Sequence, residues 1–561
     1  MVLAADVGYA ARYIQAEPLA RVVATPVGPV QSGRPVELPL ITWGGDIATI
    51  LANGNSAATA PGSIFADQGL ELNLVRKDDF KSQVEDYLSG KTPYLRGTMG
   101  MITMAAEALD KDPRTKPVVL CQMTWSAGGD CLVVKEGIKA ARDLKGKTIA
   151  LQAYGPHVDY LTKILTDAGL SMSDVSIKWL PDLTGTDDSP AAALQADESI
   201  DAAFVIIPDG LMLTSNGTVG TGSEGSVKGA RILLSTKTAN RIIADVYAVR
   251  SDYFEANRDE VRALAHGLLL GQQALAELWK DKDARAAEYK DMITGAAQIL
   301  LDSPQAVADT EGLYQDCEFV GYAGNVKFFG DMNWPRNFEK ITSEVQSAFI
   351  GLGLLSGPVA LDQARWDYDK LRAGLTGVDD VESPRFKSEE VAKVVARKQA
   401  QGTLEEGELF SFEVFFQPNQ NTFPADMYTE AFDNVLELAS TYGGAIITVE
   451  GHSDPLGYLK NKKAGETELV LDRQKQAAKN LSMTRALAVR DAIVAYSAGK
   501  GVNLDVSQFS TVGHGIMQPK TGMCGTDPCA PKTKEEWLSN MRVVFRIIQV
   551  EAEADVFMPL D

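Results

Sequence analysis

The sequence lacks any long apolar run, and this absence limits how the chain can meet a membrane. Its best apolar segment, around Leu264 to Leu270, is interrupted by His266 and Gly267. A helix that crosses a bilayer needs about 20 mostly apolar residues, so we expect no transmembrane segment. The first residues do not form a full export signal, although Met1 to Asp6 could be the end of one that is cleaved.

The usual catalytic and metal-binding motifs are also missing. The chain has four histidines, none at a spacing such as His-x-x-x-His: His157, His266, His452 and His514. It has no Cys-x-x-Cys pair and no Gly-x-Ser-x-Gly elbow. The triplets Gly90-Lys91-Thr92 and Gly146-Lys147-Thr148 lack the earlier glycine of a phosphate-binding loop. We therefore expect no enzymatic activity, no cofactor and no metal.

Positive charge is scarce. The formal net charge of the chain is −21, whereas attraction to phosphate groups needs a basic surface. This composition argues against non-specific binding to nucleic acid or to anionic membranes.

Cysteine is rare, with five residues in the chain. Cys524 and Cys529 lie in a turn-rich loop, and we predict that they form a disulfide bond, as in proteins of an oxidising compartment. Cys121 and Cys131 flank the turn signal Gly128-Gly129-Asp130 and could face each other across a hairpin. Whether they are bonded is left open, and Cys317 has no predicted partner.

The most informative residues lie near the carboxyl end. The apolar strand predicted at Ala445 to Val449 leads to Asp454, and Ser482 is a suitable N-cap that would place Arg485 in the first turn of a helix. An acid at a strand end that faces an arginine at a helix N-terminus suits a ligand with both an ammonium and a carboxylate group.

These residues resemble the OmpA-like peptidoglycan-binding domain, over roughly residues 405 to 550. The resemblance is carried by Gly451-His452-Ser453-Asp454, Leu481-Ser482-x-x-Arg485-Ala486, Gly513-His514-Gly515 with Pro519, and Asn540-Met541-Arg542-Val543. It implies a βαβαββ α+β fold in which Asp454 holds the amine of diaminopimelate and Arg485 its carboxylate, with Gly451 and Ser453 beside them. Alternatively, Asp454 only caps a turn and Arg485 pairs with a surface acid.

This chain departs from that family at two places. The segment Pro455 to Lys479 is longer than in typical members, and Ala478 stands where the family usually has an asparagine. The role of the insertion is left open.

The first two thirds of the chain alternate short strands and helices, which predicts α/β structure with a parallel sheet. The motif Asp143-Leu144-Lys145-Gly146-Lys147-Thr148-Ile149-Ala150 resembles the start of the second lobe in periplasmic substrate-binding proteins of the nitrate, sulfonate and thiamine-precursor type. The resemblance covers roughly residues 37 to 370 and implies a two-lobe, type II periplasmic-binding-protein fold.

Together these patterns predict five segments. They are an extended arm (1–36), a first lobe (37–135 and 235–373), a second lobe (136–234), a linker with one charged helix (374–406) and the OmpA-like domain (407–552).

A two-lobe binder holds its ligand with residues at strand ends. The candidate cleft residues are Trp43, Gly44, Asp46, Thr98, Trp125, Tyr154, His157 and Asp209. Trp125 and Tyr154 could enclose a planar ligand, or the tryptophans could simply pack in a core. The helix start after Gly155 favours an anion, whereas Asp46 and Asp209 favour a cation or a hydroxyl-rich ligand, and the sequence leaves both open.

The sequence thus predicts a periplasmic solute-binding protein anchored to peptidoglycan in a Gram-negative envelope. It would capture a small molecule between its lobes, with an ABC-type permease as a plausible partner. The alternative is a wall-anchored scaffold or sensor whose two-lobe domain binds a protein.

Overall fold

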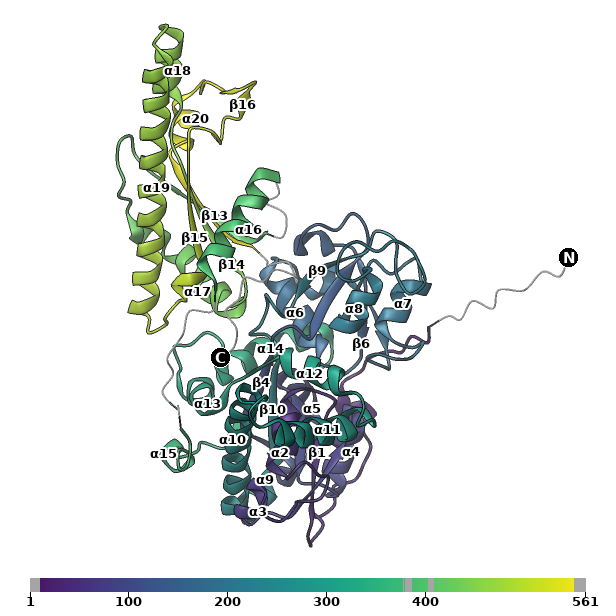
Figure 1. The fold of residues 1–561 in the computed structure, drawn as a ribbon. Helices are drawn as coiled ribbons and strands as arrows, with labels where there is room; N and C mark the ends of the chain where they lie inside the picture. Colours follow the sequence, from purple (N-terminus) through teal and green to yellow (C-terminus); the bar gives the residue numbers. More distant parts are fainter. Residues whose placement is uncertain (1–10, 377, 379–385, 402–407, 549–561) are drawn as a thin grey trace, which may run out of the picture. The chain divides into compact units, whose positions relative to one another are not determined.

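A computed structural model gives the fold of the chain and describes residues 11–376, 378, 386–401 and 408–548 (Figure 1). The chain divides into two compact units, one ending at Val381 and the other beginning at Glu382. Residues 1–10 of the predicted arm, residues 377, 379–385 and 402–406 of the predicted linker, and residues 407 and 549–552 of the predicted OmpA-like domain lie outside the described residues.

The first unit contains two α/β lobes, the first built on a two-stranded sheet beside a five-stranded sheet and the second on one five-stranded sheet. The strands of the first lobe are β1 (Val36–Leu40), β2 (Leu72–Arg76), β3 (Tyr94–Thr98), β4 (Pro117–Ser126), β10 (Ala244–Arg250), β11 (Cys317–Phe319) and β12 (Asp362–Gln363). Those of the second lobe are β5 (Asp130–Val134), β6 (Thr148–Gln152), β7 (Ser176–Leu180), β8 (Ala202–Ile206) and β9 (Arg231–Ser235).

Both lobes order their strands in the same way. In the second lobe the order is β7-β6-β8-β5-β9. In the first lobe β2 pairs with β1, β1 lies beside β3, and the sheet continues as β3-β10-β4. In these orders the fourth strand is antiparallel to the third: β10 to β3 in the first lobe and β5 to β8 in the second. Each of these fourth strands follows, along the chain, a strand of the other lobe. This order is that of the type II periplasmic-binding-protein fold, as the sequence predicted.

Helices cover both sheets. Those of the first lobe are α2 (Gly45–Ala52), α3 (Ile64–Asp67), α4 (Phe80–Ser89), α5 (Met99–Leu109), α9 (Ser251–Ala256), α10 (Arg258–Lys280), α11 (Ala286–Leu301), α12 (Val307–Gln315), α13 (Gly321–Gly330), α14 (Phe338–Leu352) and α15 (Tyr368–Leu371). Those of the second lobe are α6 (His157–Asp167), α7 (Pro190–Ala196) and α8 (Ile207–Leu213).

The helix ends follow local rules. Asp79 caps α4 by accepting from the backbone N–H of Ser82, and Gly90 ends the same helix at φ 80°. The apolar faces then meet the sheets in separate cores, represented by Leu38, Ile47 and Leu268 in the first lobe and by Val133, Leu194 and Val205 in the second.

Two segments cross between the lobes, from β4 to β5 and from β9 to β10. Because β5 begins at Asp130 and β9 ends at Ser235, the second lobe begins about six residues earlier than the predicted boundary at residue 136. Sequence patterns predicted strands at β4 and β5, but they cannot tell which sheet a strand joins.

The described part of the N-terminal arm packs on both lobes. It contains the short helix α1 (Leu19–Val22). Ile14 bridges to Trp179 of the second lobe, while the backbone N–H groups of Gly28 and Gln31 donate to Leu88 and Gly90 of the first. Outside this helix, the described part of the arm has no long regular element, and its backbone bonds hold it to both lobes.

The second unit is built on a sheet of order β13-β18-β14-β15. Its strands are β13 (Glu408–Phe415), β14 (Ile446–His452), β15 (Phe509–Gly515), β18 (Arg542–Ile548) and the hairpin β16 (Met523–Cys524) with β17 (Asp527–Pro528). Its helices are α16 (Ser388–Gln401), α17 (Thr429–Thr441), α18 (Leu456–Lys463), α19 (Glu468–Gly499) and α20 (Lys534–Ser539).

Helix α16 is the charged helix that the sequence placed in a linker. Its valines Val391, Val394 and Val395 are buried against Ile446 and Ile548 of the sheet. The helix is therefore part of the core of the second unit, because its three valines recur on one face despite its high charge.

The insertion Pro455 to Lys479 folds as α18 and the first part of α19. Tyr458 and Leu471 form a small core with Ile516, and the hydroxyl of Tyr458 donates to Asp527 at 3.0 Å. Asp527 lies in the hairpin that the disulfide closes, so the insertion and the hairpin support each other.

The predicted Cys524–Cys529 disulfide is present. Cys121 and Cys131 are not bonded: both are free and buried, as is Cys317. The hairpin interpretation is wrong because Cys121 belongs to β4 of the first lobe and Cys131 to β5 of the second.

Helix α19 lies directly on β14 and β15, and glycines make this approach possible. A Cβ atom on Gly451 would lie 1.8 Å from the carbonyl oxygen of Ser482, and one on Gly513 would lie 2.8 Å from that of Lys479. Both contacts are with helix backbone, which has little freedom to yield. The glycines of the motifs therefore set the distance between helix and sheet.

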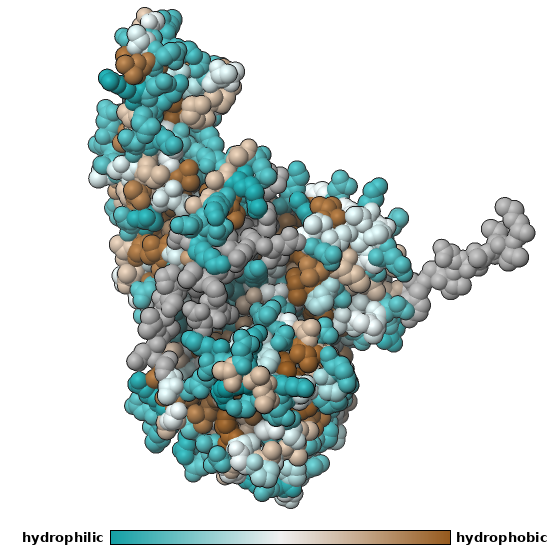
Figure 2. All heavy atoms as spheres, viewed as in Figure 1, coloured by the Kyte–Doolittle hydropathy of each residue, from teal (hydrophilic) through white to brown (hydrophobic). Residues whose placement is uncertain are grey.

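No helix in the described ranges is both long and apolar enough to cross a membrane. On the face drawn in Figure 2, hydrophobic residues form separate groups within a mainly hydrophilic surface.

We predict that Gly451→Ala destabilises the chain by at least about 2 kcal/mol, because the added methyl group forces α19 away from the sheet. Urea denaturation measures the change. Gly457→Ala is the matched control, since a Cβ atom at this exposed position of α18 has no atom within 4 Å. Alanine there should be neutral or stabilising, and equal losses in both variants would contradict the close-approach argument.

Candidate functional site

Four of the largest fully buried side chains are arginines: Arg96, Arg250, Arg336 and Arg485. Three of them have carboxylate partners. Arg96 is 2.9 Å from Asp46 and 3.0 Å from Asp245, Arg250 is 2.8 Å from Asp252, and Arg336 is 3.0 Å from Glu344. Arg485 forms no ion pair with any carboxylate of the described residues, which sets it apart.

Arg485 bonds only to backbone oxygen atoms. Its Nε donates to the carbonyl of Gln420 at 2.8 Å, Nη2 to that of Gln417 at 3.2 Å, and Nη1 to that of His452 at 3.3 Å. The guanidinium lies 5.1 Å from the ring centre of Phe416. Burial lowers its pKa to about 10, because no carboxylate offsets the loss of water.

Asp454 follows β14 directly and is half-buried. Its Oδ1 is buried without a hydrogen-bond partner, as is the indole Nε1 of Trp537. Burial raises the pKa of Asp454, partly offset by Trp537, the backbone N–H of Leu456 and the charge of Lys460. Since Arg485 donates to His452, two residues before Asp454, both predicted ligand groups lie at the same end of β14.

Ser482 is not an N-cap, and Arg485 is not in a first helical turn. Helix α19 begins at Glu468, so both residues lie in its middle. Residues 468–481 contain no glycine or proline that would interrupt a helix, so α19 continues on the N-terminal side of Ser482. Ser482 Oγ instead donates to Lys479 and accepts from the N–H of Gly515 at 2.9 Å. A helix dipole therefore does not act on the ligand at Arg485.

The neighbouring motif residues hold the local backbone. Gly451 permits the approach of α19, as described above. The N–H of Ser453 donates to Gly515 at 2.7 Å, and its hydroxyl donates to Ala478 of α19 at 3.0 Å. Gly451 and Ser453 thus shape the strand end from which Asp454 projects.

A second cluster of polar side chains lies around the segment that crosses from β4 to β5. We call residues 126–130 together with Thr236 the lobe junction. The backbone N–H groups of Gly128 and Asp130 both donate to Thr236 Oγ1 at 3.1 Å, which joins the two crossing segments. Asp130 accepts from Ser126 Oγ at 2.6 Å and lies 2.7 Å from Nε2 of His157.

Three predicted cleft residues gather at the lobe junction. The ring of Trp43 lies against Gly129, where a Cβ atom would be 2.6 Å from it, and its Nε1 donates to Thr124 at 2.9 Å. His157 is bonded to Asp130. Asp209 follows Ile207, whose N–H donates to the carbonyl of Gly129 at 2.7 Å.

The other predicted cleft residues are engaged elsewhere. Asp46 is buried in the core beside Arg96, and Trp125 packs against Phe328 and Trp334. Thr98 caps α5, Tyr154 exchanges hydrogen bonds with the backbone of Glu17 in the arm, and Gly44 packs on Leu313. Trp125 and Tyr154 therefore do not enclose a common space in this structure.

Sequence reasoning missed Asp130, Asp316 and Thr236. A Cβ atom on Gly128 would be 3.0 Å from Oδ1 of Asp316, so this acid also faces the junction. Burial, together with the charge of Asp130, raises the pKa of Asp316 to about 7. The signal was the Gly128-Gly129-Asp130 triplet after a long apolar strand, which was interpreted as a hairpin turn rather than as a crossing between lobes.

The lobes also meet where Asp159 of α6 packs on Gly100 of α5. A Cβ atom on Gly100 would lie 2.7 Å from the Asp159 carboxyl group. Asp159 is 2 % exposed, its Oδ1 accepts from the N–H of Tyr160 at 3.0 Å, and its Oδ2 is buried without a partner. Burial raises its pKa to about 8, which Arg336 opposes and Asp130 reinforces.

The comparison with protein families finds one match in this region. The model of the family described as "NMT1/THI5 like" matches residues 62–278, which lie within the first unit and cover parts of both lobes. This agrees with the resemblance of the first unit to substrate-binding proteins. A search of curated proteins finds no match.

Solved structures resemble the first unit at low identity. The alkanesulfonate-binding protein SsuA of Xanthomonas axonopodis pv. citri, bound to MOPS, is 16% identical, over 59% of this chain and 100% of that chain, with a TM-score of 0.38. The aliphatic sulphonate binding protein SsuA of Escherichia coli is also 16% identical, over 63% and 97%, with a TM-score of 0.38. The desulfurization enzyme DSZB is 17% identical, over 60% and 99%, with a TM-score of 0.33. Likeness at this level assigns neither a ligand nor an activity.

We predict that Asp159 makes the first unit less stable as the pH rises from about 4 to about 8. Its folded-state pKa of about 8 lies above the 3.8 of an ordinary aspartate, so in this window the unfolded chain ionises while the folded chain keeps the proton. The loss can reach about 1.4 kcal/mol per pH unit.

Asp159→Asn should remove this dependence, so its stability relative to the unmodified chain should increase between pH 5 and pH 8. Urea denaturation at both values measures the difference. Asp187→Asn, at an exposed acid of the same lobe, is the control, and an Asp159→Asn profile parallel to that of the unmodified chain would contradict the prediction.

Proposed function

We propose that the chain is a periplasmic solute-binding protein whose second unit attaches it to peptidoglycan. The first unit would capture a small molecule at the lobe junction, for delivery to an ABC-type permease. The second unit would hold the diaminopimelate of the cell-wall peptide between Asp454 and Arg485. Attachment to the wall would raise the effective concentration of the binding protein near its membrane partner.

The observation that carries the wall-binding proposal is the buried guanidinium of Arg485, which has no carboxylate partner in the part of the chain that the structure describes. Its carbonyl partners satisfy hydrogen-bond donors but supply no negative charge. A buried charge normally has a charged partner, because its desolvation costs several kcal/mol. The other three fully buried arginines follow that rule. A ligand carboxylate would provide the partner that Arg485 lacks.

Asp454 would complete the recognition. Its unpartnered Oδ1 can accept from an ammonium group, which would favour the ionised carboxyl and lower the raised pKa. One acid and one arginine at the same strand end suit the zwitterionic end of diaminopimelate. Since Arg485 is 1% exposed and bonds to Gln417 and Gln420, the ligand would have to displace the turn that contains these two residues.

The family match over residues 62–278, the type II topology and the joined crossing segments support solute capture by the first unit. Asp209 and Asp316 lie next to the lobe junction, which contains Asp130, and burial together with the charge of Asp130 raises the pKa of Asp316 to about 7 against the opposing charge of Lys237. A cationic group on the ligand would relieve this repulsion. The proposal therefore favours a ligand with an amine over a sulfonate.

We expect Asp454→Ala and Arg485→Lys to weaken binding to purified peptidoglycan by at least about tenfold. Asp454→Ala removes the carboxylate that would accept from the ligand ammonium, and Arg485→Lys keeps the charge but removes the planar guanidinium that can bond a carboxylate through two N–H groups. For hydrogen bonds to charged groups a loss of about 1.5–3 kcal/mol is typical. Sedimentation of the full chain with peptidoglycan measures binding, and circular dichroism checks that each variant is folded.

Arg490→Gln is the matched control for the wall site, because Arg490 lies on the same helix but pairs with Asp491. It should sediment as the unmodified chain does, and free diaminopimelate should release both. Full retention of binding by folded Asp454→Ala and Arg485→Lys would refute the assigned site.

For the first unit, thermal-shift screening with amines, amino acids, sulfonates and hydroxyl-rich compounds should find a saturable increase in melting temperature with an amine-bearing compound. Asp316→Asn should reduce that increase, since it removes one junction charge. Asp187→Asn again serves as the control.

A shift with sulfonates alone would support capture but refute the preference for a cation. No shift with any compound would favour the alternative of a wall-anchored scaffold or sensor that binds a protein.

A further inference from the structure

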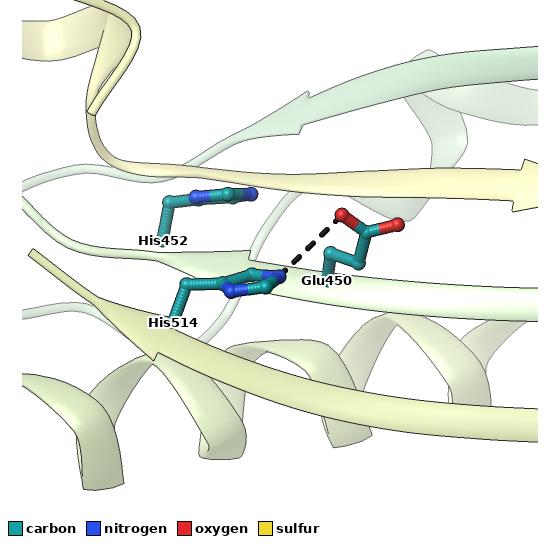
Figure 3. Close-up of side chains that lie close together, drawn as sticks. All are labelled: Glu450, His452 and His514. Carbon is teal, nitrogen blue, oxygen red and sulfur yellow. Dashed lines mark ion pairs between the residues drawn. The ribbon is translucent and has the colours of Figure 1, made fainter. Parts of the chain in front are cut away.

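Three buried side chains of the second unit converge on the neighbouring strands β14 and β15. They are Glu450 and His452 of β14 and His514 of β15, which are 2%, 2% and 7% exposed (Figure 3). One carboxylate oxygen and one nitrogen from each imidazole lie within 4.8 Å of one another. In the close-up, both imidazole rings point toward the side of Glu450, and the rings stack with centres 4.9 Å apart.

A hydrogen bond to the backbone leaves one ring nitrogen of His452 able to bind a metal ion. Its Nδ1 donates to the carbonyl of Gln518 at 2.9 Å. In the neutral imidazole this leaves Nε2 with a free lone pair, and that atom is buried without a hydrogen-bond partner. Metal-bound histidines characteristically donate their other N–H to a carbonyl or a carboxylate.

His514 has the same arrangement. Nδ1 lies 3.0 Å from the side-chain amide of Gln399, whose oxygen accepts the Nδ1 proton when the amide is turned, an orientation that heavy-atom positions alone do not distinguish. Nε2 has no hydrogen bond and lies 3.5 Å from Oε2 of Glu450. That separation is close to the ~3.4 Å between two atoms held tetrahedrally about 2.1 Å from a zinc ion.

Glu450 offers one oxygen. Its Oε1 accepts from Thr448 Oγ1 at 2.8 Å and lies 3.2 Å from Nε of Arg546. Oε2 faces the imidazoles. The nearby positive charges have their own acids, since Arg546 pairs with Glu408 and Arg542 lies 3.1 Å from Glu413.

We propose that Glu450, His452 and His514 bind a divalent transition metal of the zinc class. Two imidazole nitrogens and one carboxylate oxygen form a ligand set that zinc accepts, with a water molecule in the fourth position. The metal joins β14 to β15 and, through Gln399, fixes α16 on the sheet. His452 also accepts from Arg485 through its carbonyl, so the metal stabilises the strand end that carries the proposed wall site.

The full chain, stripped with a chelator, tests the proposal. It should take up about one equivalent of Zn²⁺, its melting temperature should rise as metal is added, and Co²⁺ should give the visible absorption of a low-coordinate site. His514→Gln and Glu450→Gln should each lower the affinity at least tenfold, whereas His266→Gln, on α10 and outside the cluster, should leave it unchanged.

A residue-level readout keeps the test independent of how the variants fold. Hydrogen exchange at the imidazole C2 position, followed by mass spectrometry, should slow at His452 and His514 on addition of Zn²⁺ and stay constant at His157 and His266. No uptake by the unmodified chain, or uptake without protection of His452 and His514, would overturn the proposal. Peptidoglycan sedimentation with and without metal is a separate measurement, so failure of wall binding and failure of metal binding are distinguishable.

Discussion

The second unit depends on the close contact between helix α19 and the strands β14 and β15. Backbone atoms of Ser482 and Lys479 occupy the space that side chains at Gly451 and Gly513 would need. This contact places Arg485 next to the end of β14, where its Nη1 donates a hydrogen bond to the carbonyl of His452. It also aligns the two strands so that His452 and His514 stack. The proposed wall site and the proposed metal site therefore share one packing constraint.

The buried arginines contrast a structural role at Arg96 with the role in recognition that we propose for Arg485. Arg96 lies between Asp46 and Asp245, and the hydroxyl of Tyr247 also donates to Asp46. These charges hold the core of the first lobe together, and Arg96 has two carboxylate partners there, although its Nη2 is buried without a hydrogen-bond partner among the described residues. Arg485 has carbonyl groups and one aromatic face instead. A missing counter-charge is a stronger sign of a binding site than burial alone, because burial without compensation costs stability.

In the second unit, the strand that ends before Asp454 and the Cys524–Cys529 disulfide were predictable because their sequence signals are local. The apolar residues of β14 predict a strand, and Asp454 comes two residues after its end. The Cys524–Cys529 disulfide joins residues that are five positions apart in the sequence. The N-cap role of Ser482 was wrong because the inserted residues extend α19 over 32 residues. Helix length depends on the whole segment, whereas capping rules consider only a few residues. In the first unit, Trp43, His157 and Asp209 were found at strand ends, while Asp130 was hidden in an apparent hairpin.

The sequence by itself determined the alternating α/β pattern, the strand that ends at Asp454 and the glycines that allow close packing, since each of these follows from neighbouring residues. Only the tertiary structure decided which sheet β5 joins, that Asp46 is a core residue, that Arg485 lacks a carboxylate, and that Glu450, His452 and His514 meet. These facts concern groups that are up to about 200 residues apart, such as Asp46 and Asp245. Charge pairing and burial are properties of spatial neighbours, and the order of residues along a chain does not specify them.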